Sequence, residues 1–229
     1  VAANTAKVGI TTDQSSAITA NTAKVGITST QASLIDGITA TSTELNLLDG
    51  VTSLASSING LSDGLVEGNS IYLGNDPSST TDNSQYNVSV GISALNSITT
   101  GQKNVAVGYK ALNENTTGYS NTAVGLQALD ENTTGVQNTA LGAGSLSDNT
   151  TGIRNSALGS GTLWQNTIGE NNTAAGYGAL QYNTTGSSNT ATGANSLYTN
   201  TTGDNNTAVG RNALFYNTVA DKNTALGFY

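Results

Sequence analysis

Residues 118–134 read GYSNTAVGLQALDENTT, and residues 135–151 read GVQNTALGAGSLSDNTT. Asn, Ala, Gly and Leu recur at one spacing in both stretches, while the residues between them differ. Self-similarity at a fixed period is the sequence signature of a repeat architecture. We therefore expect the recurring residues to define a shape, and the variable residues to lie on its surface.

The repeat extends over the C-terminal two-thirds of the chain. The motif N-[TSV]-[AS]-x-G returns at a constant 17-residue interval, without insertion, from Asn87 to Asn223. This gives eight full units over residues 84–219 and a partial ninth. We number each unit from its first Asn, so that position 5 is Gly and position 9 is Leu. The Leu residues are Leu95, Leu112, Leu129, Leu146, Leu163, Leu180, Leu197 and Leu214, and the Gly residues are Gly91, Gly108, Gly125, Gly142, Gly159, Gly176, Gly193 and Gly210.

The unit predicts a mostly β fold, a parallel β-solenoid or β-roll. Two Gly per unit disfavour a helix, because each costs about 1 kcal/mol relative to Ala in a helix interior. An invariant unit length indicates units that stack in register, and a rise of about 4.8 Å per coil gives a rod of roughly 40 Å for eight units. We expect position 5 to need glycine for a positive φ or a close backbone approach. Asn at positions 1 and 12 is expected in left-handed turns and in stacked amide ladders.

The predicted core is thin. Each unit offers the Leu at position 9 and a medium-sized residue at position 4, and burying one such side chain contributes about 1.5–3 kcal/mol. Ordering a residue costs at least about 1 kcal/mol, so a single chain looks marginal. We therefore expect a parallel homotrimer in which three chains share one core.

The N-terminal third predicts a different structure. Residues 1–65 contain capping boxes such as Thr41…Glu44, which predict short helices of an interrupted trimeric coiled-coil stalk. Residues 66–83 are expected to be an adaptor that leads into the solenoid of residues 84–229. Asn4 and Asn21 fall in the apolar seam, where they could ring an anion on a three-fold axis or set the register of the helices.

The composition disfavours several classes of function. The net charge of −8 is spread thinly, without the basic cluster of a nucleic-acid-binding protein. No apolar run is long enough to insert into a membrane. The chain has no His and no Cys, which disfavours His-based catalysis and thiolate metal sites. We expect no catalytic residue, metal or cofactor, and thus no enzyme, although two scattered carboxyl groups could meet on one ridge. The absence of Met predicts a piece of a longer chain, and so does the end of the chain ten residues after the eight full units of residues 84–219.

Aromatic side chains at variable positions are the candidate ligand contacts. Exposed rings can stack on sugars, or they can pack over coil edges and between subunits. These aromatic residues are Tyr109, Trp164, Tyr177, Tyr182, Tyr198, Phe215 and Tyr216. The NTT triplets at Asn115 and Asn132 match the N-glycosylation sequon, but they also follow from the turn repeat.

The units NTAVGLQAL, NSALGSGTL and NTALGAGSL resemble the repeats of trimeric autotransporter adhesin heads and of marine phage tail fibres. ITATSTELNLLDGVTS, residues 38–53, resembles a repeat common in phage tail-fibre proteins. The resemblance implies a left-handed β-roll in a homotrimeric fibre. It further implies a virion appendage that attaches to a host-surface glycan or protein, through this or an adjacent region. The alternative is a bacterial surface adhesin or filament subunit, extracellular or at the cell surface.

Overall fold

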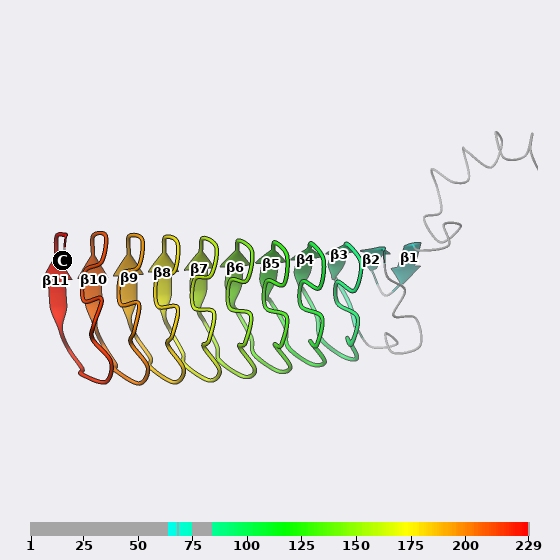
Figure 1. The fold of residues 1–229 in the computed structure, drawn as a ribbon. Coiled ribbons are helices and arrows are strands. Elements are labelled where there is room, and N and C mark those ends of the chain that lie inside the picture. Colours follow the sequence, from blue (N-terminus) through cyan, green and yellow to red (C-terminus); the bar gives the residue numbers. More distant parts are fainter. Residues whose placement is uncertain (1–63, 68, 75–83, 229) are drawn as a thin grey trace, which may run out of the picture. The chain divides into compact units, whose positions relative to one another are not determined.

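One 17-residue unit forms one coil of a parallel β-solenoid, so the predicted mostly β solenoid is confirmed. The structure is a computed structural model that describes residues 64–67, 69–74 and 84–228. Its strands form a single sheet, in which each strand lies beside the next one in the sequence (Figure 1). About nine coils, one for each strand from β3 to β11, follow one another along the chain.

The first two strands pair antiparallel, and every later pair is parallel. The register advances by one unit at each step, so that Ala123 lies beside Ala140 and Val124 beside Leu141. The strands are β1 (Gly64–Glu67), β2 (Ser70–Leu73), β3 (Val88–Val90), β4 (Val105–Val107), β5 (Thr122–Val124), β6 (Thr139–Leu141), β7 (Ser156–Leu158), β8 (Thr173–Ala175), β9 (Thr190–Thr192), β10 (Thr207–Val209) and β11 (Thr224–Leu226).

The strand of each coil covers positions 2 to 4. Thr and Val are frequent at positions 2 and 4, and β-branched residues favour the extended backbone. Side chains alternate across a strand, so only the middle residue at position 3 points inward. In β5, for example, Ala123 is buried between the half-buried Thr122 and the exposed Val124. The inward residue is Ser89 in β3 and Ala in every strand from β4 to β11, which keeps each coil thin.

The other side of each coil is made of turns. The backbone is left-handed at positions 7, 9 and 17, as at Gln127 (φ 55°), Leu129 (φ 53°) and Gln137 (φ 58°). This conformation costs an L-residue about 1–2 kcal/mol. Asn at positions 1 and 12 has an ordinary negative φ. The prediction that these residues take the left-handed conformation is wrong. Backbone bonds link the turns of successive coils, such as Leu129 N–H to the Ser145 carbonyl at 3.0 Å.

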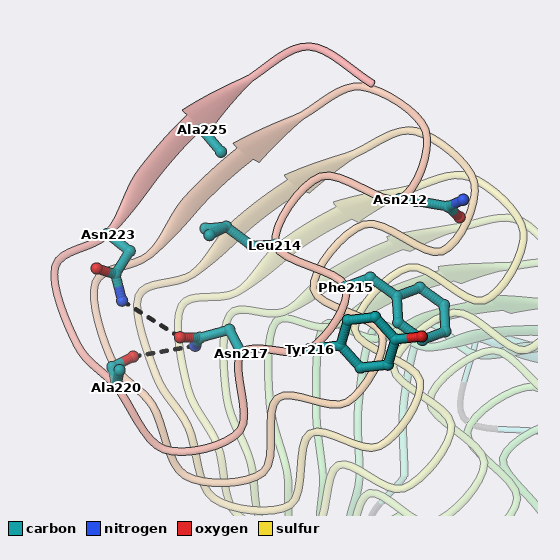
Figure 2. Close-up of a pocket in the computed structure, with 8 residues that line it drawn as sticks. All are labelled: Asn212, Leu214, Phe215, Tyr216, Asn217, Ala220, Asn223 and Ala225. Carbon is teal, nitrogen blue, oxygen red and sulfur yellow. Dashed lines mark hydrogen bonds between the residues drawn. The ribbon is translucent and has the colours of Figure 1, made fainter. Parts of the chain in front are cut away.

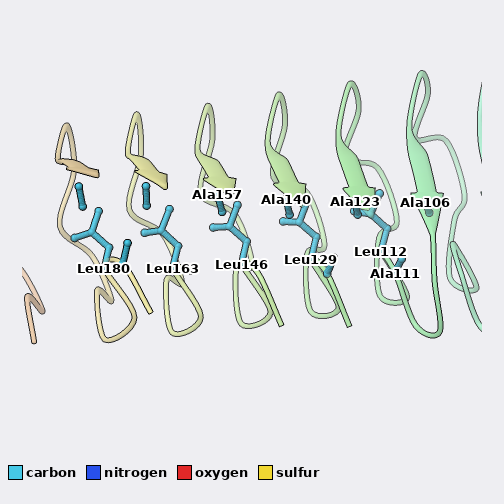
Figure 3. Packing of buried hydrophobic residues seen from close by; sticks show 14 of the residues in the cluster. Ala106, Ala111, Leu112, Ala123, Leu129, Ala140, Leu146, Ala157, Leu163 and Leu180 are labelled. Atoms are coloured by element: carbon cyan, nitrogen blue, oxygen red, sulfur yellow. The ribbon is translucent and has the colours of Figure 1, made fainter. Parts of the chain in front are cut away.

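The core is a single column of small side chains facing Leu. Leu at position 9 is fully buried in seven coils and packs against the Ala of positions 3 and 8 (Figure 3). In the last full coil Leu214 is half-buried. The expectation that position 4 joins this core is wrong, because Leu158 is 53% exposed and Leu141 36% exposed. One chain thus encloses its own Leu column, and the thinness of the core no longer argues for a shared one.

Two ladders of Asn side chains run along the coils, as predicted. At position 1, the Oδ1 atom of Asn121 accepts the backbone N–H of Asn138 at 2.9 Å. At position 12, the Nδ2 atom of Asn132 donates to Asn115 Oδ1 at 2.8 Å. Both columns also donate to one carbonyl: Gly135 O accepts from Asn121 at 2.8 Å and from Asn132 at 3.1 Å. Each coil is therefore bonded to the next by side chains as well as by backbone.

Glycine at position 15 is required by a close approach of coils. A Cβ atom built on Gly135 would lie 2.6 Å from the carbonyl oxygen of Gly152, in the next coil. Position 15 has no positive φ, so contact alone excludes a side chain. Gly at position 5 combines both reasons that the sequence suggested: Gly125 has φ 140°, and a Cβ there would lie 2.6 Å from Gly142 O. Ala220 is the one exception at position 15 among the described coils, and there it is exposed.

The N-terminal end of the solenoid is closed by residues that precede the repeat or depart from its pattern. Ser70 Oγ accepts the backbone N–H of Asn87 at 2.8 Å, a bond that later coils make to the preceding Asn. The buried Tyr72 hydroxyl lies 3.0 Å from Ser84 Oγ. Ile98 replaces the first Asn of the position 12 ladder and is fully buried. The antiparallel β1 then covers the edge of β2, which blocks further parallel stacking.

The predicted coiled-coil stalk and the seam residues Asn4 and Asn21 lie outside the described residues. Within the described ranges, no helix occurs that could cross a bilayer.

The close approach at position 15 yields a test. Gly135→Ala should lower the free energy of unfolding by about 1–3 kcal/mol, because the methyl group would overpack the contact with Gly152. Ala220→Gly is the matched control and should change it by less than about 0.5 kcal/mol. Thermal and urea unfolding followed by circular dichroism would measure both. Equal effects of the two substitutions would contradict the close approach.

Candidate functional surfaces

Four carboxyl groups gather on one edge of the solenoid. Positions 10 and 11 of three successive coils place Glu114, Asp130, Glu131 and Asp148 on neighbouring turns. Three of them border an open hollow of about 460 Å³, which is also lined by Lys110. The sequence allowed for two carboxyl groups on one ridge, and the fold brings four together there.

Burial and mutual repulsion change the proton affinity of this ridge. The pKa of Glu131 is raised above its usual value of 4.5, first by burial and then by the charges of Asp148, Asp130 and Glu114. Burial also raises the pKa of Asp148, although hydrogen bonds from Ser147 and Trp164 act in the opposite direction. Across the described residues, no three His, Cys, Asp or Glu side chains are placed to hold a metal ion. The ridge is a stack of like charges at the surface.

Aromatic rings occupy the same edge on later coils. The ring centroids of Tyr182 and Tyr198 lie 5.0 Å apart, edge to face. Tyr198 stacks on Phe215 with centroids 4.9 Å apart and an interplanar angle of 14°, and Phe215 meets Tyr216 at 4.8 Å. These four rings therefore pack on one another along the coil edge. Such packing is the alternative to sugar stacking that the sequence left open. A role in glycan binding stays a prediction for them.

The other candidate aromatic residues, Trp164, Tyr109 and Tyr177, are exposed. Trp164 is 44% exposed, and its ring lies against Gly144, where an added Cβ would come within 3.3 Å. Tyr109 and Tyr177 stand at position 6, where they are 48% and 65% exposed. The fold thus divides the candidates between two surfaces, and it does not unite them in one site.

The NTT sequons are not available for glycosylation in the folded chain. Asn115 and Asn132 are fully buried. Their side chains are also bonded to each other in the position 12 ladder. Attachment of a sugar to either amide would break the ladder, so these triplets serve the turn.

The C-terminal end of the described coils is an open face. A hollow of about 520 Å³ lies there, among residues of the last full unit and the partial unit that follows it (Figure 2). Asn223 donates to Asn217 Oδ1 at 3.2 Å, and Asn217 donates to the Ala220 carbonyl at 3.0 Å. The lining residues are Asn212, Leu214, Phe215, Tyr216, Asn217, Ala220, Asn223 and Ala225. The hollow lies where the stack of described coils ends, and its lining needs no ligand to explain it.

One further surface, which we call the outer face, was not predicted from the sequence. It consists of the side chains at positions 2, 4 and 6, which lie on the sheet from β3 to β11 and at the corner that follows each strand. Val124 at position 4 is 37% exposed and Leu126 at position 6 is 52% exposed. The alternation of side chains along positions 2 to 4 was the available signal, since it places positions 2 and 4 together on one side of the strand and position 3 on the other.

Comparison with known proteins gives no relative: no family profile, curated protein or solved structure matches this chain.

The carboxyl ridge makes stability depend on pH. Since the folded-state pKa of Glu131 and Asp148 is raised, the folded chain binds protons more tightly than the unfolded chain. The contribution of these two groups to the free energy of unfolding should therefore increase as the pH falls from neutral through their raised pKa values. The increase should end near the usual pKa values, 4.5 for Glu131 and 3.8 for Asp148. Glu131→Gln should raise the melting temperature at neutral pH and reduce its increase on acidification.

Glu170→Gln removes the same charge from a different corner and serves as the control. Melting temperatures of the three proteins, measured from neutral pH down to the usual carboxyl pKa, would test this prediction. The account fails if the parent shows no increase on acidification, or if both substitutions act alike.

Proposed function

We propose that this chain is part of a structural fibre on a virion, such as a phage tail fibre, that contributes to attachment to a host surface. In this proposal the chain assembles as a parallel homotrimer. It contacts a host-surface glycan or protein through this region or an adjacent one. The role of the described residues is to hold distance and direction, and no chemical step is assigned to them.

The observation that carries the proposal is the uninterrupted stacking of the coils. Every coil from β3 to β11 is bonded to its neighbours by parallel strands and by turn backbone, and two Asn ladders run along the stack. Nine coils at about 4.8 Å each give a stiff rod of roughly 40 Å. A solenoid of this kind adds length in equal steps, which suits a spacer between an anchoring end and a binding end.

The resemblance of the repeats supports the choice of an appendage. The units around Asn121 and Asn138 resemble those of adhesin heads and phage tail fibres, and residues 38–53 resemble a tail-fibre repeat. The variable positions of each unit lie at the surface, where the ridge and the aromatic edge differ from coil to coil. Such a rod can vary its surface without changing its core.

A bacterial trimeric adhesin or filament subunit is the second candidate, because the same repeats resemble adhesin heads. The location of the protein separates the two. Immunogold electron microscopy of a producing culture, with an antibody raised against residues 84–219, should label virion appendages. Label on cell surfaces or free filaments would favour the adhesin instead. Label confined to the cell interior, with pre-immune serum as the control, would contradict both.

A further inference from the structure

The outer face carries almost no charge along the whole solenoid. None of the nine residues at position 2 or the nine at position 4 is charged, and Arg211 is the one charged residue at position 6. The other charges of residues 84–228 fall at positions 7, 10, 11, 16 and 17 of the unit. A chain with a net charge of −8 thus keeps one long surface neutral.

Positions 4 and 6 of this neutral surface are mostly apolar and are exposed or half-buried, whereas position 2 is Thr or Ser in seven of its nine occurrences. Leu158 at position 4 is 53% exposed, and Ile92 and Tyr177 at position 6 are 66% and 65% exposed. Nine coils at about 4.8 Å and the three residues from position 4 to position 6 at about 3.3 Å give an apolar strip of roughly 40 by 10 Å, or about 400 Å². Soluble monomers rarely expose an apolar patch larger than a few hundred Å². With position 2 included, the uncharged outer face is about 650 Å², which approaches the roughly 800 Å² per partner of a stable interface.

We propose that the outer face is the surface on which copies of this chain pack against one another, parallel and in register. The proposal rests on the self-association stated in the proposed function and identifies the face that mediates it. A parallel copy in register has the same coil spacing along its whole length. Each coil of one copy therefore lies against the equivalent coil of its neighbour. Rotational symmetry then closes the assembly with identical contacts. The charged ridge and the aromatic edge, at positions 10 and 11, stay outside the contact.

Single cysteines can test both the face and the direction, because the chain has no Cys of its own. Val107→Cys and Val209→Cys each place one thiol at position 4, near opposite ends of the solenoid. The reagent is a bis-maleimide of about 10 Å span, the spacing of packed sheets. In a parallel assembly each full-length variant should cross-link to itself. Ile168→Cys is the control: it lies at position 14, outside the face, and is 52% exposed.

Sedimentation gives the mass first, and denaturing gels then give the cross-linking rate. The proposal expects a multiple of the chain mass. It also expects both face variants to cross-link about 100-fold faster than the control, because packed faces hold the thiols at millimolar effective concentration. A monomer would overturn this inference and the self-association together, and leave the immunogold result to decide the location. If the protein is a multimer but neither face variant cross-links, or only one does, the result would overturn the outer face as the contact surface or the parallel direction of packing. The self-association itself would then stand.

Discussion

The structure depends on the contact between one coil and the next at position 15 of the repeat. There the backbones of successive coils approach so closely that only Gly fits, and the Gly carbonyl accepts hydrogen bonds from both Asn ladders. Gly135 shows the arrangement: its carbonyl binds Asn121 and Asn132, and it lies against Gly152. This contact fixes the rise between coils, and the fixed rise allows every other group to meet its equivalent one unit further on. A repeat of constant length follows, since one added residue would break all the ladders at once.

The same constraint decides where variation is permitted. Inward residues are largely limited to Ala and Leu because the coil is thin, and each Leu combines a left-handed backbone with deep burial. Leu146 has φ 52° and no exposed surface, so its burial must offset the cost of that backbone conformation. Outward positions are free of this limit, so one edge can be acidic around Glu131 and aromatic around Tyr198 on the same scaffold. The proposed self-association uses the remaining outward surface, where variation is almost entirely restricted to uncharged side chains.

The sequence was sufficient for the period, the solenoid class, the Asn ladders and the need for Gly, because these follow from residues that recur at fixed positions. It was not sufficient for the inward and outward sides of the strand. In a three-residue strand, alternation alone does not say whether Ala123 or Val124 faces the core. Nothing in a Leu residue signals a left-handed backbone, so the turn residues were misplaced at the Asn positions. The N-terminal cap was missed because Ser70 and Tyr72 stand outside the repeat. The carboxyl ridge and the outer face required the coil geometry, which brings equivalent residues of neighbouring units side by side.

Deletion of one unit tests the central claim, that coils stack in strict register, most directly. Removing residues 138–154 takes out one whole unit and joins Gln137 to Asn155, whereas removing residues 139–154 takes out one residue fewer. Thermal unfolding followed by circular dichroism would compare both with the parent chain. We expect the whole-unit deletion to keep a cooperative transition within about 4 °C of the parent, corresponding to about 1 kcal/mol. The shorter deletion should melt far lower, because its ladders no longer align. Equal stability of the two deletions, or unfolding of the whole-unit deletion, would contradict the account.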